Sequence, residues 1–126
     1  MVALRSSVLA LFFLCACAQS QPQQALKIKS LVDGCFTVGR ITLDETNEPI
    51  LATASITSSV ATADCPCKSA VMAYTVSQKK DGNTFTLISG QFSALGKTSI
   101  DFPIAVQKQL VFPNTPILIA FSCADN

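Results

Sequence analysis

The chain contains no histidine and no tryptophan, and only 9 basic and 8 acidic residues occur among its 126 residues. Without histidine it offers no serine–histidine triad, no cysteine–histidine dyad and no imidazole metal site. Its formal net charge of +1 lacks the basic excess that is typical of nucleic-acid binders. It also has no G-x-S-x-G, phosphate-binding or dinucleotide-binding motif. We therefore predict a protein that is not an enzyme, with no cofactor, metal or nucleic-acid partner.

The first residues have the layout of a secretory signal. Arg5 precedes the apolar run of residues 8–14 (VLALFFL), and the small residues of CACA follow it. The run is much shorter than the roughly 20 apolar residues that span a bilayer. We predict a signal peptide over residues 1–18, a polar linker over residues 19–25 and one domain over residues 26–126. The protein would then be exported to the periplasm or cell envelope.

Two cleavage patterns compete at this boundary. Ala16-Cys17-Ala18 matches the A-x-A rule and would release a chain that begins at Gln19. The overlapping stretch of residues 14–17 (LCAC) resembles a bacterial lipobox, although Cys15 is atypical within it. In that case Cys17 would carry the lipids and would be the domain's only contact with the membrane. Both alternatives remain open.

Apolar and polar residues alternate along most of the mature chain, which is typical of strands with one buried face. The alternation is clear over residues 26–29, 50–60, 72–76, 100–107 and 117–123. Over residues 36–43 the apolar face switches across Gly39-Arg40, which indicates a bulge. A helical turn or two is expected only near residues 91–95.

Turn residues separate these runs. Asp81-Gly82 predicts a tight hairpin, and breaks are expected at residues 47–49, 95–97 and 113–116. About seven short strands at this spacing predict an all-β, antiparallel two-layer sandwich, immunoglobulin-like in the loose sense. Because a small domain needs its large side chains to offset chain entropy, five phenylalanines are assigned to its core. They are Phe36, Phe85, Phe102, Phe112 and Phe121.

Four cysteines lie in the predicted domain, at Cys35, Cys65, Cys67 and Cys123. An even number of cysteines in a small exported chain predicts a disulfide framework. Three pairings are open. In two of them Cys65 and Cys67 each join a distant partner, which favours a structural role.

In the third pairing Cys65 joins Cys67 across Pro66. A bridge over a single residue is strained, and such bridges tend to be labile. Lys68 would favour a thiolate at Cys67, so the alternative function is that of a thiol-disulfide redox protein. A metal site is disfavoured because the chain has no second C-x2-4-C motif and no histidine pair.

Residues 64–70 (DCPCKSA), which lead into Met72-Ala73-Tyr74, and the terminal Phe121-Ser122-Cys123 resemble a small family of exported bacterial proteins catalogued as a domain of unknown function. The resemblance implies a bacterial envelope protein and no assigned activity. We expect a binding or structural module whose partner is another envelope protein, for instance through strand addition. An inhibitor of an envelope hydrolase is a further alternative, and the oligomeric state is not predicted.

Mass spectrometry of the protein matured in a bacterial host distinguishes the two cleavage patterns. A diacylglyceryl mass on Cys17 would establish the lipobox. An intact mass that begins at Gln19 would instead establish ordinary cleavage after Ala18.

Overall fold

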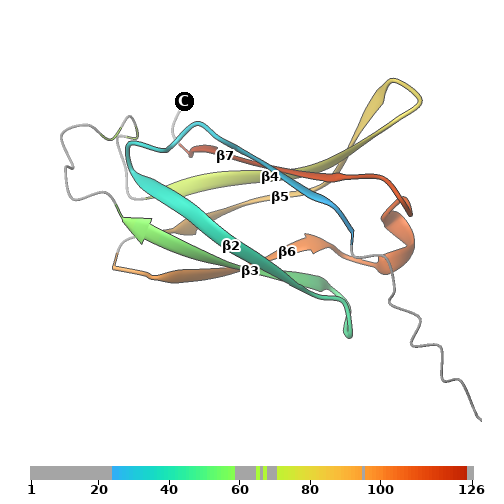
Figure 1. Cartoon of the computed structure of the whole chain (residues 1–126), viewed down its shortest axis with the longest axis horizontal. Coiled ribbons are helices and arrows are strands. Elements are labelled where there is room, and N and C mark those ends of the chain that lie inside the picture. Colours follow the sequence, from blue (N-terminus) through green and yellow to red (C-terminus); the bar gives the residue numbers. More distant parts are fainter. Residues whose placement is uncertain (1–23, 59–64, 66, 68–70, 95, 125–126) are drawn as a thin grey trace, which may run out of the picture.

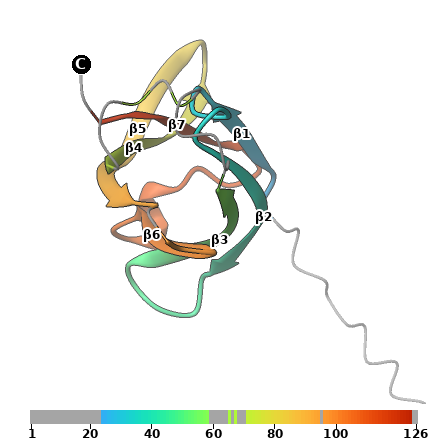
Figure 2. The same ribbon diagram turned by 90° about the vertical axis from the view of Figure 1, so that its left-hand side faces the viewer.

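Seven strands form two sheets that pack face to face (Figures 1 and 2), so the predicted all-β sandwich is confirmed. The structure is a computed structural model that describes residues 24–58, 65, 67, 71–94 and 96–124. Within these residues no helix is long and apolar enough to cross a membrane. The elements are β1 (Leu26–Ser30), β2 (Phe36–Asp44), β3 (Ile50–Ser58), β4 (Val71–Lys80), β5 (Asn83–Ser93), β6 (Ser99–Ala105), the 3₁₀ helix η2 (Lys108–Leu110) and β7 (Ile117–Cys123).

One sheet has the strand order β1-β7-β4-β5 and the other has the order β2-β3-β6. All pairs are antiparallel except β1 and β7, which run parallel with Leu26 opposite Ile117. Alternation of apolar residues reveals a strand's faces but not its neighbours, so the parallel pair was not predictable from the pattern. An immunoglobulin constant domain has a different strand order. The likeness to that fold is therefore one of architecture alone.

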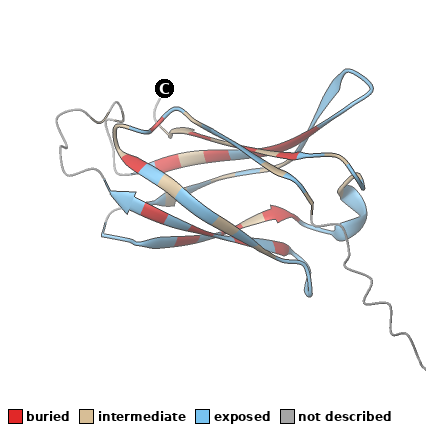
Figure 3. Cartoon of the chain, viewed as in Figure 1, coloured by how far each residue is buried: buried red, intermediate tan, exposed pale blue. Residues whose placement is uncertain are grey.

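The predicted buried faces agree with the structure in the central strands (Figure 3). In β3 every second residue from Ile50 to Ile56 is buried, and in β7 the same holds from Ile117 to Phe121. Two residues of β2, Gly39 and Arg40, lie opposite the single residue Ser55. The predicted bulge is thus confirmed, and it explains why the buried parity of β2 changes.

The structure departs from the predicted pattern at the end of β6 and near residues 91–95. Val106 does not share the buried face of β6, because the strand ends at Ala105 and the Val106 side chain is 54% exposed. The helical turn expected near residues 91–95 is wrong over residues 91–93, which belong to β5. The short helix η2 forms at residues 108–110 instead. Val60, the last residue of the alternation predicted over residues 50–60, lies outside the described residues.

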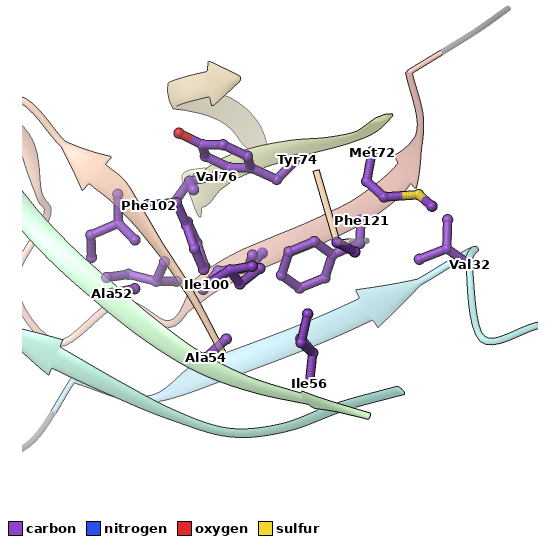
Figure 4. Close-up of a cluster of buried hydrophobic side chains, with 14 of the residues drawn as sticks. Val32, Ala52, Ala54, Ile56, Met72, Tyr74, Val76, Ile100, Phe102 and Phe121 are labelled. Atoms are coloured by element: carbon purple, nitrogen blue, oxygen red, sulfur yellow. The ribbon is translucent and has the colours of Figure 1, made fainter. Parts of the chain in front are cut away.

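Aromatic side chains form the centre of the core (Figure 4). The Tyr74 ring centroid lies 4.9 Å from that of Phe102, and Phe102 in turn contacts Phe121 edge-on at 5.9 Å. Phe36 and Phe92 also contact Phe121 edge-on. Tilted and edge-on pairs at these separations stabilise a core beyond the effect of buried area alone. The sandwich is therefore held together by rings from both sheets.

A tight turn between β4 and β5 allows the chain to reverse direction sharply. Asp81 and Gly82 have φ values of 53° and 78° and join Lys80 to Asn83 in a two-residue hairpin loop. Positive φ at both positions is typical of a type I′ turn. The hairpin predicted from Asp-Gly is confirmed.

Gly90 is required by the ring of Tyr74, its cross-strand partner. A Cβ atom at position 90 would lie 2.8 Å from Cε1 and 2.9 Å from Oη of Tyr74. Because that ring is buried against Phe102, we expect Gly90→Ala to lower the free energy of unfolding by about 1–3 kcal/mol. Gln91→Ala, at the next and exposed position, is the matched control and should change it by less than about 0.5 kcal/mol. Equal urea midpoints for the two variants would contradict this packing.

Burial raises the pKa of Tyr74 above its ordinary value of 10.0. Tyr74 is the only tyrosine, so phenolate absorbance reports its ionisation directly. The folded protein should titrate above pH 10, and the chain unfolded in urea should titrate near 10. The folded state then binds more protons than the unfolded state above pH 10, so stability declines as the pH rises past that value. A titration midpoint that is the same with and without urea would refute the assignment.

Candidate functional site

The four domain cysteines meet at the end of the sandwich where β7 ends and β4 begins. Cys35 is joined to Cys65 and Cys67 to Cys123, with Cα–Cα distances of 4.4 and 5.1 Å. Both bridges are long-range, spanning 30 and 56 positions of the sequence. The structure thus contains one of the two long-range pairings that the sequence left open. The self-closed Cys65–Cys67 bridge is not the pairing present.

The two bridges also tie the two sheets together. Cys35 directly precedes β2 in the three-stranded sheet, and Cys123 ends β7 in the four-stranded sheet. Their partners, Cys65 and Cys67, are only two positions apart between β3 and β4. All four side chains are half-buried and pack against the hydrophobic core. One short stretch of chain is therefore linked covalently to both layers.

The bridges crowd three sulfur atoms together. The Sγ atoms of Cys35, Cys65 and Cys67 all lie within 4.8 Å of one another, a group we call the sulfur cluster. Metal binding requires thiolates, whereas all three sulfurs are held in disulfides here. Lys68, which was expected to favour a Cys67 thiolate, and Cys17, the candidate lipid anchor, lie outside the described residues.

The β4–β5 hairpin lies at the opposite end of the sandwich (Figure 1). A second group of side chains comes from this hairpin and from the loop that follows η2. Phe85 and Phe112 contact each other edge-on with centroids 5.2 Å apart, and Lys80 Nζ lies 4.6 Å from the centroid of Phe112. Phe85 is 42% exposed and Phe112 is half-buried. Their assignment to the core is therefore wrong, whereas Phe36, Phe102 and Phe121 are buried as predicted. We call Phe85, Phe112 and Lys80 the aromatic platform.

The side chain of Gln78 holds the backbone of Phe112, one residue of the aromatic platform, through hydrogen bonds. The Gln78 side chain is fully buried. Its Nε2 donates to the carbonyl oxygens of Phe112 and Thr115 at 3.1 and 2.9 Å, and its Oε1 accepts from the Phe112 N–H at 2.8 Å. The Gln24 side chain donates to the same two carbonyls. A buried amide with satisfied hydrogen bonds orders the groups around it, so the loop that carries Phe112 is held in place.

The role of Gln78 was not predicted from the sequence, although a signal was present. Gln78 has the same parity as Met72, Tyr74 and Val76, whose side chains were assigned to a buried face. A polar side chain on such a face needs hydrogen-bond partners, and this requirement points to a structural or binding role.

β5 is an edge strand of unusual composition. It pairs with β4 and, within the described chain, with no other strand. Its eleven residues, NTFTLISGQFS, contain no charged residue and no proline. The other edges carry such residues: Lys27 and Lys29 in β1, Arg40 and Asp44 in β2, and Asp101 and Pro103 in β6. Charges and prolines are the usual means by which proteins prevent edge strands from pairing. Among the described residues, the feature of β5 that opposes such pairing is the bulge at Leu87.

The model of a family of uncharacterized proteins conserved in bacteria (DUF2195) matches residues 8–126. The chain therefore belongs to this family, in agreement with the resemblance to a bacterial family of unknown function. No curated protein and no solved structure matches the chain.

Each disulfide should contribute substantially to stability, because each closes a long loop in the unfolded chain. Replacing Cys35 and Cys65 together with alanine is expected to lower the free energy of unfolding by about 4 kcal/mol in the chain-entropy model. Replacing Cys67 and Cys123 together should cost slightly more, because the closed loop is longer. Urea unfolding of both double variants measures these losses. Losses below about 1 kcal/mol would contradict a structural role for the bridges.

Proposed function

We propose that this protein is a module of the bacterial envelope that binds another envelope protein by strand addition at β5. The observation that carries the proposal is the β5 edge itself, eleven residues long without a charge or a proline. In strand addition an extended segment of the partner forms main-chain hydrogen bonds with an exposed edge, and side-chain contacts add specificity. The two disulfides support export, because such bridges persist in oxidising compartments.

The aromatic platform suggests the chemistry of the partner segment. Phe85 lies on β5 itself, and its exposed ring offers an apolar contact beside the edge. Lys79 and Lys80 lie exposed on the adjoining end of β4. A segment that pairs with β5 would therefore place an apolar side chain on Phe85 and an acidic one near these lysines. Because Gln78 already fixes Phe112, little ordering of the platform is needed on binding.

Site-specific photocrosslinking in the bacterial envelope tests this proposal. A photoreactive residue in place of Ser89, which is exposed on β5, should form one discrete adduct. The matched control is Thr42, an exposed position on β2, the edge of the other sheet, and it should not form this adduct. The substitution Gln91→Lys should abolish the adduct formed from the photoreactive residue at position 89, because a charge on an edge strand blocks pairing.

Hydrogen exchange separates strand addition from other contacts. The amides of β5 that point away from β4 should exchange freely in the isolated protein and become protected in the complex. An adduct that persists in the Gln91→Lys variant, or unchanged exchange of β5, would overturn the proposal. An adduct with the mass of two copies of this chain would overturn the choice of partner.

A further inference from the structure

The sulfur cluster contains two disulfides whose sulfur atoms come close to one another. Besides the bonded pair Cys35–Cys65, the Sγ of Cys67 lies within 4.8 Å of both of those sulfurs. Cys65 Sγ also lies 3.8 Å from the carbonyl oxygen of Cys67. A structural role requires only that each bridge closes its own loop. The two-residue spacing of Cys65 and Cys67 brings the two bridges together, but loop closure does not itself require their sulfur atoms to approach one another.

We propose that the sulfur cluster is a thiol-disulfide exchange site, in which reduction of the Cys35–Cys65 bridge leads to opening of the Cys67–Cys123 bridge. This inference does not depend on strand addition at β5. Exchange proceeds by attack of a thiolate on a disulfide sulfur. The cluster supplies the nearby sulfurs, and a dithiol reductant supplies two electrons.

The first step consumes the reductant. A dithiol attacks the Cys35–Cys65 bridge, is oxidised to its own disulfide, and leaves two thiols, on Cys35 and Cys65. In the second step one of these thiols loses its proton to solvent, and the thiolate attacks the Sγ of Cys67. A new bond to Cys67 forms, the Cys67–Cys123 bond breaks, and Cys123 leaves as a thiolate that takes up a proton. No further oxidant or reductant is needed.

Either sulfur of the Cys35–Cys65 bridge can act as the nucleophile after reduction, because the Sγ atoms of both residues lie within 4.8 Å of the Sγ of Cys67. Attack by Cys65 gives the Cys65–Cys67 bridge, and attack by Cys35 gives a Cys35–Cys67 bridge. In both products Cys123 is free. One two-electron reduction thus detaches the end of β7 from the segment between β3 and β4.

Single cysteine variants of the full chain, matured in a bacterial host, test the second step directly. Cys35→Ser leaves the Cys65 thiol beside the intact Cys67–Cys123 bridge, and Cys65→Ser leaves the Cys35 thiol there. We expect alkylation at pH 8 to label Cys123 in both variants, accompanied by a Cys65–Cys67 or Cys35–Cys67 bridge in peptide mapping. The double variant Cys35→Ser/Cys65→Ser is the matched control and should keep Cys67–Cys123 unlabelled.

The rate of labelling separates a built site from chance encounters of thiols. Below the thiol pKa the rate should fall about tenfold per pH unit, because only the thiolate attacks. It should also fall at least about tenfold in denaturing urea, where the sulfurs are no longer held together. The proposal fails if alkylation labels only Cys65 in the Cys35→Ser variant and only Cys35 in the Cys65→Ser variant. It also fails if Cys123 is labelled as fast in urea as in the folded protein.

The unsubstituted protein provides a second test that does not depend on how the variants fold. One equivalent of dithiothreitol, followed by acid quenching and alkylation, yields the two-electron-reduced species. We expect a fraction of these molecules to carry a new bridge between Cys67 and either Cys65 or Cys35. In these molecules Cys123 and the remaining member of the Cys35–Cys65 pair should both be alkylated. If every two-electron-reduced molecule retains one of the two original bridges, there is no exchange and the proposal fails.

Discussion

The stability of the sandwich depends on the covalent link between its two sheets at one end. The chain must pass from β3 in one sheet to β4 in the other, and Cys65 and Cys67 lie on that passage. Each is bonded to a different sheet, through Cys35 before β2 and through Cys123 at the end of β7. A domain of this size buries a limited apolar core. Restricting the unfolded chain at this passage compensates for that limit.

The opposite end is held by hydrogen bonds instead of bridges in the part of the chain that the structure describes. The buried amide of Gln78 satisfies both carbonyls and the amide of the loop that follows η2. Gln24, just before β1, joins the same carbonyls. Leaving such a buried group without partners costs about 1–3 kcal/mol, so the arrangement resists loss of any one contact. The loop beside the β4–β5 hairpin is therefore ordered without a covalent link.

Much of the fold was predictable because strands reveal their buried face through a period of two. Ile50 to Ile56 and Ile117 to Phe121 follow that rule. Gly39 marks the bulge, where a Cβ atom would lie 2.5 Å from Ser55 Oγ, and Asp81-Gly82 marks the hairpin by its positive φ values. The period of two shows which face of a strand is buried, but it does not show how far along the strand the opposite sheet extends. The β4–β5 hairpin extends past the other sheet (Figure 1). Phe85 lies near the start of β5, close to the hairpin turn, and this residue of core type is exposed.

The candidate sites were predictable to a smaller extent, for a related reason. Cys35, Cys65, Cys67 and Cys123 were identified as a framework, but their pairing depends on which strands become neighbours. The pairing of β7 with β4 places Cys123 opposite Met72, near the start of β4. That pairing joins segments far apart in the sequence. No local pattern encodes it, whereas the closeness of the two bridges follows from the spacing of Cys65 and Cys67, which the sequence shows directly.

The same topology separates the two proposed sites while leaving them on connected strands. Cys123 ends β7, β7 pairs with β4, and β4 pairs with β5, whose free edge carries Phe85. The Cys67–Cys123 bridge anchors the far ends of β7 and β4, while Gln78 anchors their near ends beside the aromatic platform. Opening the bridge therefore removes a covalent restraint on the end of β7, while the backbone pairing of β7 with β4 and of β4 with β5 does not involve the sulfur atoms. Because the hydrogen bonds of Gln78 do not depend on the sulfur atoms, the edge and its platform should keep their geometry when the cluster exchanges. Binding at β5 and exchange at the sulfur cluster are thus physically separable properties of one sheet.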